Sequence, residues 1–119
     1  MAPKRRRLSR SAEFERVYRQ GRSRANRYLV LYVFPRGEAD AAAGGPRLGL
    51  SVSRKVGGAA ERNRVKRCLR EAFWAQADRL PPGADYVAVA RPDLGPVAEA
   101  EGMPGVRRAL AELVDQIAA

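Results

Sequence analysis

The most regular hydrophobic pattern in the chain lies between Val56 and Leu80, in VGGAAERNRVKRCLREAFWAQADRL. Apolar residues recur there at steps of three and four, which predicts an amphipathic helix with one buried face. That face comprises Val65, Cys68, Leu69, Ala72 and Phe73, and Leu80 prolongs it. The pattern indicates that this helix packs against the core of the fold.

A second face of the same predicted helix is almost purely cationic. It carries Asn63, Lys66, Arg67 and Arg70 at positions i, i+3, i+4 and i+7, with Arg62 and Arg64 beside them. Like charges at helical spacing repel each other, so a solvated helix normally mixes acidic with basic residues. Binding of a polyanion would offset this repulsion. The simpler alternative is a charged face that meets only water.

Two stretches before this helix alternate as β-strands do. In YLVLYVF, residues 28–34, one face is aliphatic and the other is largely aromatic. The aliphatic face comprises Leu29, Leu31 and Val33, and the other face comprises Tyr28, Val30, Tyr32 and Phe34. In RLGLSVS, residues 47–53, leucine and valine alternate with small or polar residues. An accessible aromatic face would stack on unpaired bases, but the same side chains would serve equally well as core.

The remaining elements follow from weaker signals. Ser11 can cap a short helix that Gly21 ends, DYVAVAR at 85–91 reads as a strand, and Pro104 can begin a final helix. The segments predicted to be irregular are a mobile basic arm at 1–10, a basic turn at 22–27, a flexible loop at 35–46 and a loop at 93–103. The order α-β-β-α-β-α, with room for a short extra strand, predicts an α+β sandwich of helices on a small mixed sheet. Its length suits a single domain over residues 1–119.

The net charge and its distribution along the chain indicate which class of macromolecule the protein binds. The formal net charge is +10, and the excess is confined to residues 1–70, whose net charge is +14 against −4 for residues 71–119. Such a footprint is typical of a protein that binds nucleic acid. Arginine accounts for 20 of the 23 cations, a bias that either phosphate recognition or a GC-rich coding sequence explains.

Residue content excludes several classes of site. Cys68 is the only cysteine and there is no histidine, so disulfides, cysteine-based metal sites and histidine-dependent nucleophilic catalysis are excluded. No apolar run approaches the ~20 residues that span a bilayer, and the basic start is not followed by the apolar region of a signal peptide. We therefore expect a cytoplasmic protein that does not associate with membranes.

The central run KVGGAAERNRVKRCLREAF, preceded by RLGLSVSR and followed by LPPGADYVAVARP, resembles the protein subunit of bacterial ribonuclease P. The resemblance extends to RLSRSAEFERVYRQG and LVLYVF, and so covers roughly residues 4–115. It implies a left-handed βαβ crossover, which the strong default for right-handed crossovers would not predict. It also implies that the chain binds a large catalytic RNA and helps it to remove the 5′ leader of precursor tRNA.

The resemblance further implies which functions belong to the catalytic RNA and which belong to this protein. The RNA would carry the active site and its Mg²⁺ ions, so we expect no catalytic residue and no metal ligand in this chain, and no obligate protein partner. The residues expected to bind the catalytic RNA are Arg62, Asn63, Arg64, Lys66, Arg67 and Arg70. The residues expected to bind the single-stranded leader are Phe14, Tyr18, Tyr32, Phe34, Arg54, Lys55 and Arg91. Two positions depart from the family pattern: Arg54 stands where lysine is usual, and Gly58 where asparagine is usual.

Two other readings of the sequence compete with this one. A ribosomal protein or an RNA chaperone would show the same charge, although charge alone does not require the full motif string. A DNA-binding regulator would use residues 62–70 as a recognition helix and would need a partner helix just upstream. The strand RLGLSVS occupies that place instead.

Overall fold

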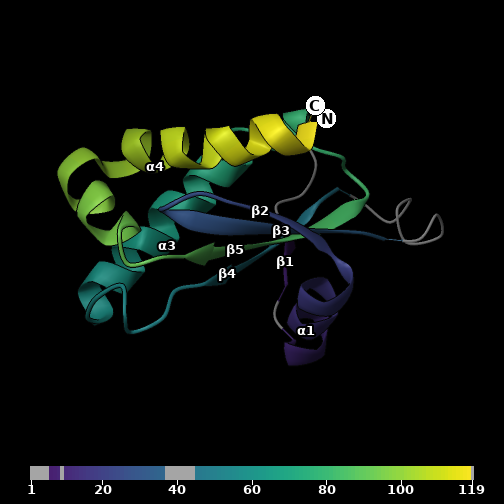
Figure 1. The fold of residues 1–119 in the computed structure, drawn as a ribbon, viewed down its shortest axis with the longest axis horizontal. Helices are drawn as coiled ribbons and strands as arrows, with labels where there is room; N and C mark the ends of the chain where they lie inside the picture. Colours follow the sequence, from purple (N-terminus) through teal and green to yellow (C-terminus); the bar gives the residue numbers. More distant parts are fainter. Residues whose placement is uncertain (1–5, 9, 37–44, 119) are drawn as a thin grey trace.

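The structure is a computed structural model that describes residues 6–8, 10–36 and 45–118. Figure 1 shows its elements in chain order. They are β1 (Arg6–Arg7), α1 (Ser11–Gln20), β2 (Arg22–Ala25), β3 (Leu29–Pro35), β4 (Arg47–Ser51), α3 (Ala59–Trp74), the short 3₁₀ helix η1 (Ala77–Arg79), β5 (Ala84–Ala90) and α4 (Leu94–Ala118).

The strands form one mixed five-stranded sheet in the order β1-β4-β5-β3-β2. Strands β4 and β5 are parallel neighbours joined through α3, whereas β3 pairs antiparallel with both β5 and β2. The fold is therefore α+β, and its β4-α3-β5 unit is a βαβ crossover. The left-handed sense expected for that crossover stays a prediction.

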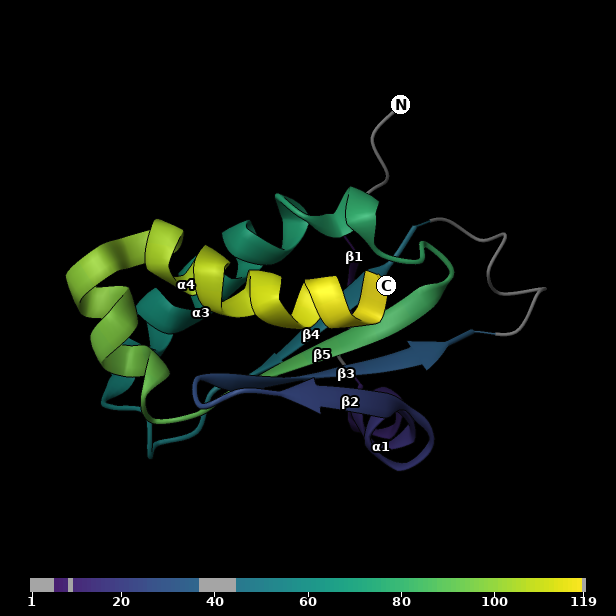
Figure 2. The ribbon, with the colours of Figure 1, turned by 45° about the horizontal axis from the view of Figure 1, so that its top comes forward.

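The helices lie on both faces of the sheet. Figures 1 and 2 show α3 and α4 together on one face and α1 on the other. The main core lies between the sheet, α3 and α4, and it contains the predicted aliphatic face of β3. Its members from α3 and β3 are Val65, Leu69, Ala72, Phe73, Leu29, Leu31 and Val33. A smaller core of Leu8, Val17 and Val87 lies under α1. The hydrophobic periodicity therefore predicted correctly how α3 and β3 are buried.

Two basic segments predicted to be irregular form strands. Residues 22–25 of the predicted turn form β2, all of it exposed, because β3 offers a strong antiparallel partner at the sheet edge. Arginine on such an edge strand protects it against pairing with another chain. Within the predicted arm, Arg6–Arg7 pair with β4 and Leu8 is 2% exposed. The mobility predicted for the remainder of the arm concerns residues 1–5 and 9, which lie outside the described part of the chain.

The prediction of a loop over residues 93–103 is wrong. The chain is helical from Leu94, whose side chain and that of Ala98 are buried four residues apart. Pro96 suggested a loop, but it stands in the first turn, where a backbone N–H has no partner within the helix. The kink falls at Gly102, whose φ of 64° belongs to the left-handed region, and Pro104 follows it in the first turn of the second segment.

Smaller differences concern Ser11, Tyr28, Cys68 and the loop at 35–46. Arg10 rather than Ser11 occupies the N-cap of α1. Tyr28 packs against the main core instead of joining the aromatic face, and Cys68 is only half-buried. Pro35 ends β3 and Arg36 is 9% exposed, so the predicted loop begins later, and residues 37–44 lie outside the described part.

Candidate nucleic-acid interface

The basic face of α3 is fixed in its orientation by the apolar face of the same helix. Val65 and Leu69 are fully buried, and Phe73 is 1% exposed, so rotation of α3 about its axis is set by the core. The side chains predicted to bind the catalytic RNA then point away from it. Asn63, Arg64, Arg67 and Arg70 are exposed, and Arg62 and Lys66 are half-buried. We call these six residues the basic face.

Between described residues, none of the salt bridges uses a cation of the basic face. The salt bridges formed within the described part of the chain use other arginines, on α1, β4 and α4 among other elements. On the basic face, Arg62 Nε donates a hydrogen bond to the Gly58 carbonyl oxygen at 3.4 Å. An exposed row of cations of this kind favours a polyanionic ligand.

Aromatic side chains gather on the opposite face of the sheet, where α1 crosses it. The ring centroids of Tyr18 and Tyr32 lie 4.9 Å apart in an edge-to-face arrangement, and those of Phe14 and Tyr18 lie 6.4 Å apart. Phe34 belongs to the same sheet face, and the Arg16 guanidinium lies 5.2 Å from its ring centroid. Tyr18 is 39% exposed, so its ring is open to a ligand. We call Phe14, Tyr18, Tyr32 and Phe34 the aromatic surface.

Small residues on β4 allow α1 to approach the sheet. A Cβ atom at Gly49 would lie 2.6 Å from the Phe14 ring, so this ring packs directly over the glycine. The face of β4 that carries small or polar residues is therefore covered at Gly49 by Phe14. Two residues further along the strand, Ser51 lies on the same face of β4, near Tyr18. Burial raises the pKa of Tyr18, the Ser51 side chain lowers it and the nearby Tyr32 raises it, for a net rise above 10.0.

A buried ion cluster, not predicted from the sequence, holds α1 against the sheet. Asp85 is fully buried on β5 and accepts hydrogen bonds at 2.7 Å from Arg36 Nη1, Arg47 Nε and Arg47 Nη2. Arg47 Nη1 also donates to Glu13 Oε2 of α1 at 2.7 Å. Arg16 of α1 lies 3.8 Å from Asp85 Oδ2. The cluster therefore connects β4, β5 and the residue that follows β3 to the helix that carries Phe14 and Tyr18.

Contacts within the cluster shift the pKa values of Asp85 and Arg47. Burial raises the pKa of Asp85, but the hydrogen bonds and charges of Arg47 and Arg36 lower it, and the net pKa lies below the ordinary 3.8. The hydrogen bond to Asp85 raises the pKa of Arg47 above its ordinary value. Asp85 is therefore a carboxylate at neutral pH. The sequence does contain one signal of this cluster, because the charged residue Asp85 stands between Ala84 and Tyr86 in an otherwise apolar strand.

The remaining residues predicted to bind the leader lie at two ends of the sheet. Arg54 and Lys55 follow β4 and Arg91 follows β5, and because these strands are parallel neighbours the three exposed cations share one end. Phe34 pairs with Asp85 near the start of β5. At about 3.3 Å per residue, Phe34 therefore lies roughly 20 Å along the sheet from Arg91. Arg91 Nη1 donates to the Asn26 carbonyl oxygen at 2.7 Å, which uses part of its hydrogen-bonding capacity.

The described part of the chain lacks two further features. It contains no group of three or more His, Cys, Asp or Glu side chains that could hold a metal ion. None of its helices combines the length and the hydrophobicity needed to cross a membrane.

Comparisons with known proteins agree over nearly the whole chain. The sequence model of the family Ribonuclease P matches residues 2–117. The ribonuclease P protein component of Shouchella clausii is 47% identical over 88 residues, covering 74% of this chain and 69% of the relative. The solved ribonuclease P protein of Staphylococcus aureus superposes with a TM-score of 0.79 at 31% identity, covering 95% of each chain. The solved ribonuclease P protein of Thermotoga maritima superposes with a TM-score of 0.79 at 34% identity, covering 95% of this chain and 98% of that protein.

The similarities in sequence and in structure indicate the same family. The described residues form a mixed sheet with three α-helices, and this fold superposes on both solved relatives. The ribosomal and chaperone alternatives are not favoured by these relatives. The chain belongs to the ribonuclease P protein family, which is the protein subunit of ribonuclease P and works with that enzyme's RNA subunit.

Proposed function

We propose that this chain assists an active site made of RNA. It binds the catalytic RNA through the basic face of α3, and it binds the 5′ leader of precursor tRNA through part of the aromatic surface. The observation that supports this division most strongly is that α3 and α1 pack on opposite faces of one sheet (Figure 1). Two RNA ligands can therefore contact the chain without competing for the same side chains.

The leader-binding part of the aromatic surface centres on Tyr18 and Tyr32. Unpaired bases stack on exposed rings with little regard to their identity, and each stacked base contributes roughly 1–3 kcal/mol. Arg54 and Lys55 are exposed at the adjacent end of the sheet and would hold leader phosphates. Affinity should therefore depend on leader length more than on leader sequence. Phe34 contributes less, because it lies under Arg16 and away from this end.

The contribution of the protein to cleavage is electrostatic and positional. Catalytic RNA and substrate are both polyanions, so cations placed between them reduce their repulsion and lower the Mg²⁺ concentration that assembly requires. This contribution decreases with added salt, because each phosphate contact releases counterions. We assign the Mg²⁺ ions to the RNA. Asp85 and Glu13 do not form a ligand set for them, since both are engaged by arginine.

We also propose that the chain acts as a single RNA-binding domain in the cytoplasm. Both proposed surfaces are built on the one sheet and depend on its two faces. A subunit that processes precursor tRNA needs access to newly made transcripts, which supports the cytoplasm as its place of action.

Two variants separate the proposed surfaces. Arg67→Ala on the basic face should weaken binding to the catalytic RNA and leave leader recognition by the assembled complex intact. Tyr18→Ala should leave assembly intact and weaken binding of precursor tRNA about tenfold, without affecting mature tRNA, which has no leader. Tyr18→Phe keeps the ring and is the matched control.

Equilibrium binding gives the readout for both. Catalytic RNA is titrated with protein, and the assembled complex is then titrated with precursor tRNA and with mature tRNA. If Tyr18→Ala lowers affinity for mature and precursor tRNA equally, the aromatic surface does not bind the leader. If Arg67→Ala assembles like the unsubstituted protein, the basic face does not hold the catalytic RNA.

A further inference from the structure

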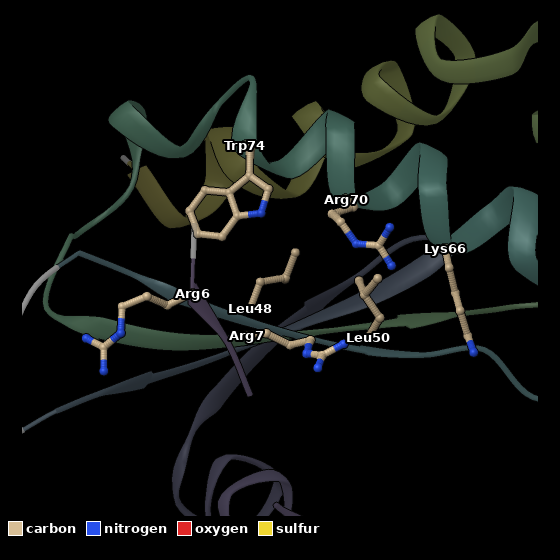
Figure 3. Close-up of a pocket in the computed structure, with 7 residues that line it drawn as sticks. All are labelled: Arg6, Arg7, Leu48, Leu50, Lys66, Arg70 and Trp74. Carbon is tan, nitrogen blue, oxygen red and sulfur yellow. The ribbon is translucent and has the colours of Figure 1, made fainter. Parts of the chain in front are cut away.

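A pocket of about 460 Å³ lies where α3 meets the β1-β4 edge of the sheet. Figure 3 shows Lys66, Arg70 and Trp74 reaching from α3 toward Leu48 and Leu50 on β4. Arg6 and Arg7 complete the lining from β1. The volume falls in the range of ~300–1,000 Å³ typical of pockets for small ligands. No role was predicted from the sequence for this pocket or for Trp74.

The lining combines two kinds of chemistry in one place. Four cationic side chains supply donors and positive charge, and none of the lining residues that the structure describes is a carboxylate. The leucines and the indole supply an apolar wall and an aromatic ring. A phosphate alone would not need the apolar wall, and an apolar ligand would not need four cations. A nucleotide presents both groups at once, with a charged phosphate and a flat base.

The indole of Trp74 is held in place before any ligand arrives. It packs edge-to-face on Phe73 with ring centroids 5.0 Å apart, and Phe73 is itself 1% exposed in the main core. Trp74 is half-buried, so part of the indole is accessible within the pocket. A ring that is both rigid and accessible suits stacking, because little conformational freedom is lost when a base binds.

The position of the pocket indicates which nucleic acid would fill it. Lys66 and Arg70 belong to both the basic face and the pocket, so RNA that lies along α3 reaches the pocket without crossing another element. The aromatic surface lies on the other face of the sheet. A base inside a duplex is not accessible for stacking, so the occupant must be an unpaired nucleotide that is splayed out of its helix.

We propose that this pocket binds one unpaired nucleotide of the catalytic RNA, with its base on Trp74 and its phosphate held by Arg7, Lys66 and Arg70. This inference rests on the proposed function, because it takes the basic face to hold that RNA. Stacking tolerates every base, so the pocket selects an unpaired position in the RNA and not a particular base there.

Trp74 provides its own readout, because it is the only tryptophan of the chain. Titration of the full-length protein with catalytic RNA should quench its fluorescence before any precursor tRNA is added. A nucleoside 5′-monophosphate at micromolar concentration should leave the fluorescence unchanged. Quenching that requires precursor tRNA, or quenching by the free mononucleotide at that concentration, would overturn the assignment to the catalytic RNA.

Substitution tests whether the contact contributes to affinity. Trp74→Leu keeps an apolar side chain and should bind the catalytic RNA about tenfold more weakly, whereas Trp74→Phe should recover most of that loss. Arg107→Ala removes an exposed cation of α4 outside both surfaces and should bind within about twofold of the unsubstituted protein, as expected for an isolated surface charge. Thermal unfolding identifies any variant that is not folded, and the fluorescence titration of the unsubstituted protein does not depend on the variants.

The outcomes separate this inference from the proposed function. If Trp74→Leu binds normally while Arg67→Ala binds weakly, the pocket assignment fails and the basic face stands. If both variants bind normally, the proposed function fails as well. Equal weakening by Trp74→Leu and Trp74→Phe would also overturn the stacking contact, because phenylalanine retains a ring.

Discussion

Replacing Asp85 with asparagine should destabilise the protein by about 3 kcal/mol. The side chain is fully buried, and both of its oxygens accept hydrogen bonds from arginine at 2.7 Å. Asparagine keeps the shape but removes the charge and one of the two acceptor oxygens. Breaking a buried ion pair by removing one partner costs roughly 3–5 kcal/mol, since the remaining charge stays buried.

The two arginines determine where in that range the loss falls. The Arg36 side chain is 4% exposed, so water cannot replace the lost carboxylate. It keeps hydrogen bonds to the carbonyl oxygens of Ala84 and Gly45. Arg47 is 17% exposed and retains Glu13. These remaining partners place the expected loss near the lower end of the range, which is still a large part of a typical ~5–15 kcal/mol domain stability.

Urea unfolding at pH 7, followed by far-ultraviolet circular dichroism, measures this loss. The matched control is Asp93→Asn, which removes an exposed carboxylate 3.1 Å from Arg27 and should cost no more than about 1 kcal/mol. Affinity for the catalytic RNA should change little in folded Asp85→Asn, because α3 packs on the other face of the sheet. A loss below about 1 kcal/mol for Asp85→Asn would refute the reasoning that the cluster anchors α1.

Three further predictions follow from the same geometry. Folding lowers the pKa of the Asp85 carboxyl, so its stabilising contribution is complete above about pH 3.8 and is lost as the pH falls through the lower pKa of the folded state. The unfolding free energies measured at pH 6 and at pH 3 should therefore differ less in Asp85→Asn than in the unsubstituted protein. Gly49→Ala should displace the Phe14 ring, lower the unfolding free energy by about 1–3 kcal/mol and weaken precursor binding; an unchanged melting curve would contradict the close contact. Arg67→Ala should reduce the slope of log affinity against log salt for the catalytic RNA by about one, and an unchanged slope would show that Arg67 meets no phosphate.

Periodicity predicted those parts of the fold in which burial repeats regularly. The apolar faces of α3 and β3 were read correctly because each element places one face in the main core. Strand β2 was missed because RSRA carries no apolar pattern, and its pairing depends on β3. The first segment of α4 was missed because Gly95 and Pro96 are turn residues in sequence, while their helical conformation depends on the burial of Leu94.

The candidate site was likewise predictable only where its residues follow a regular local pattern. Cations at helical spacing are visible in the sequence, so the basic face could be predicted from residues 62–70 alone. The aromatic surface could be predicted only in part, since the closeness of Tyr18 and Tyr32 depends on how α1 docks on the sheet. The ion cluster around Asp85 joins residues up to 72 positions apart, from Glu13 onward, and no local pattern indicates such contacts.

The most direct measurement is cleavage of a 5′-extended precursor tRNA at low, near-physiological Mg²⁺. The protein alone, the cognate catalytic RNA alone and the mixture of the two are compared under identical conditions. We expect only the mixture to produce a mature 5′ end at an appreciable rate, because we propose that the RNA carries the active site and that the protein reduces the repulsion between RNA and substrate. Cleavage by the protein alone would contradict an RNA active site, and a mixture no faster than the RNA alone would contradict the accessory role of this chain.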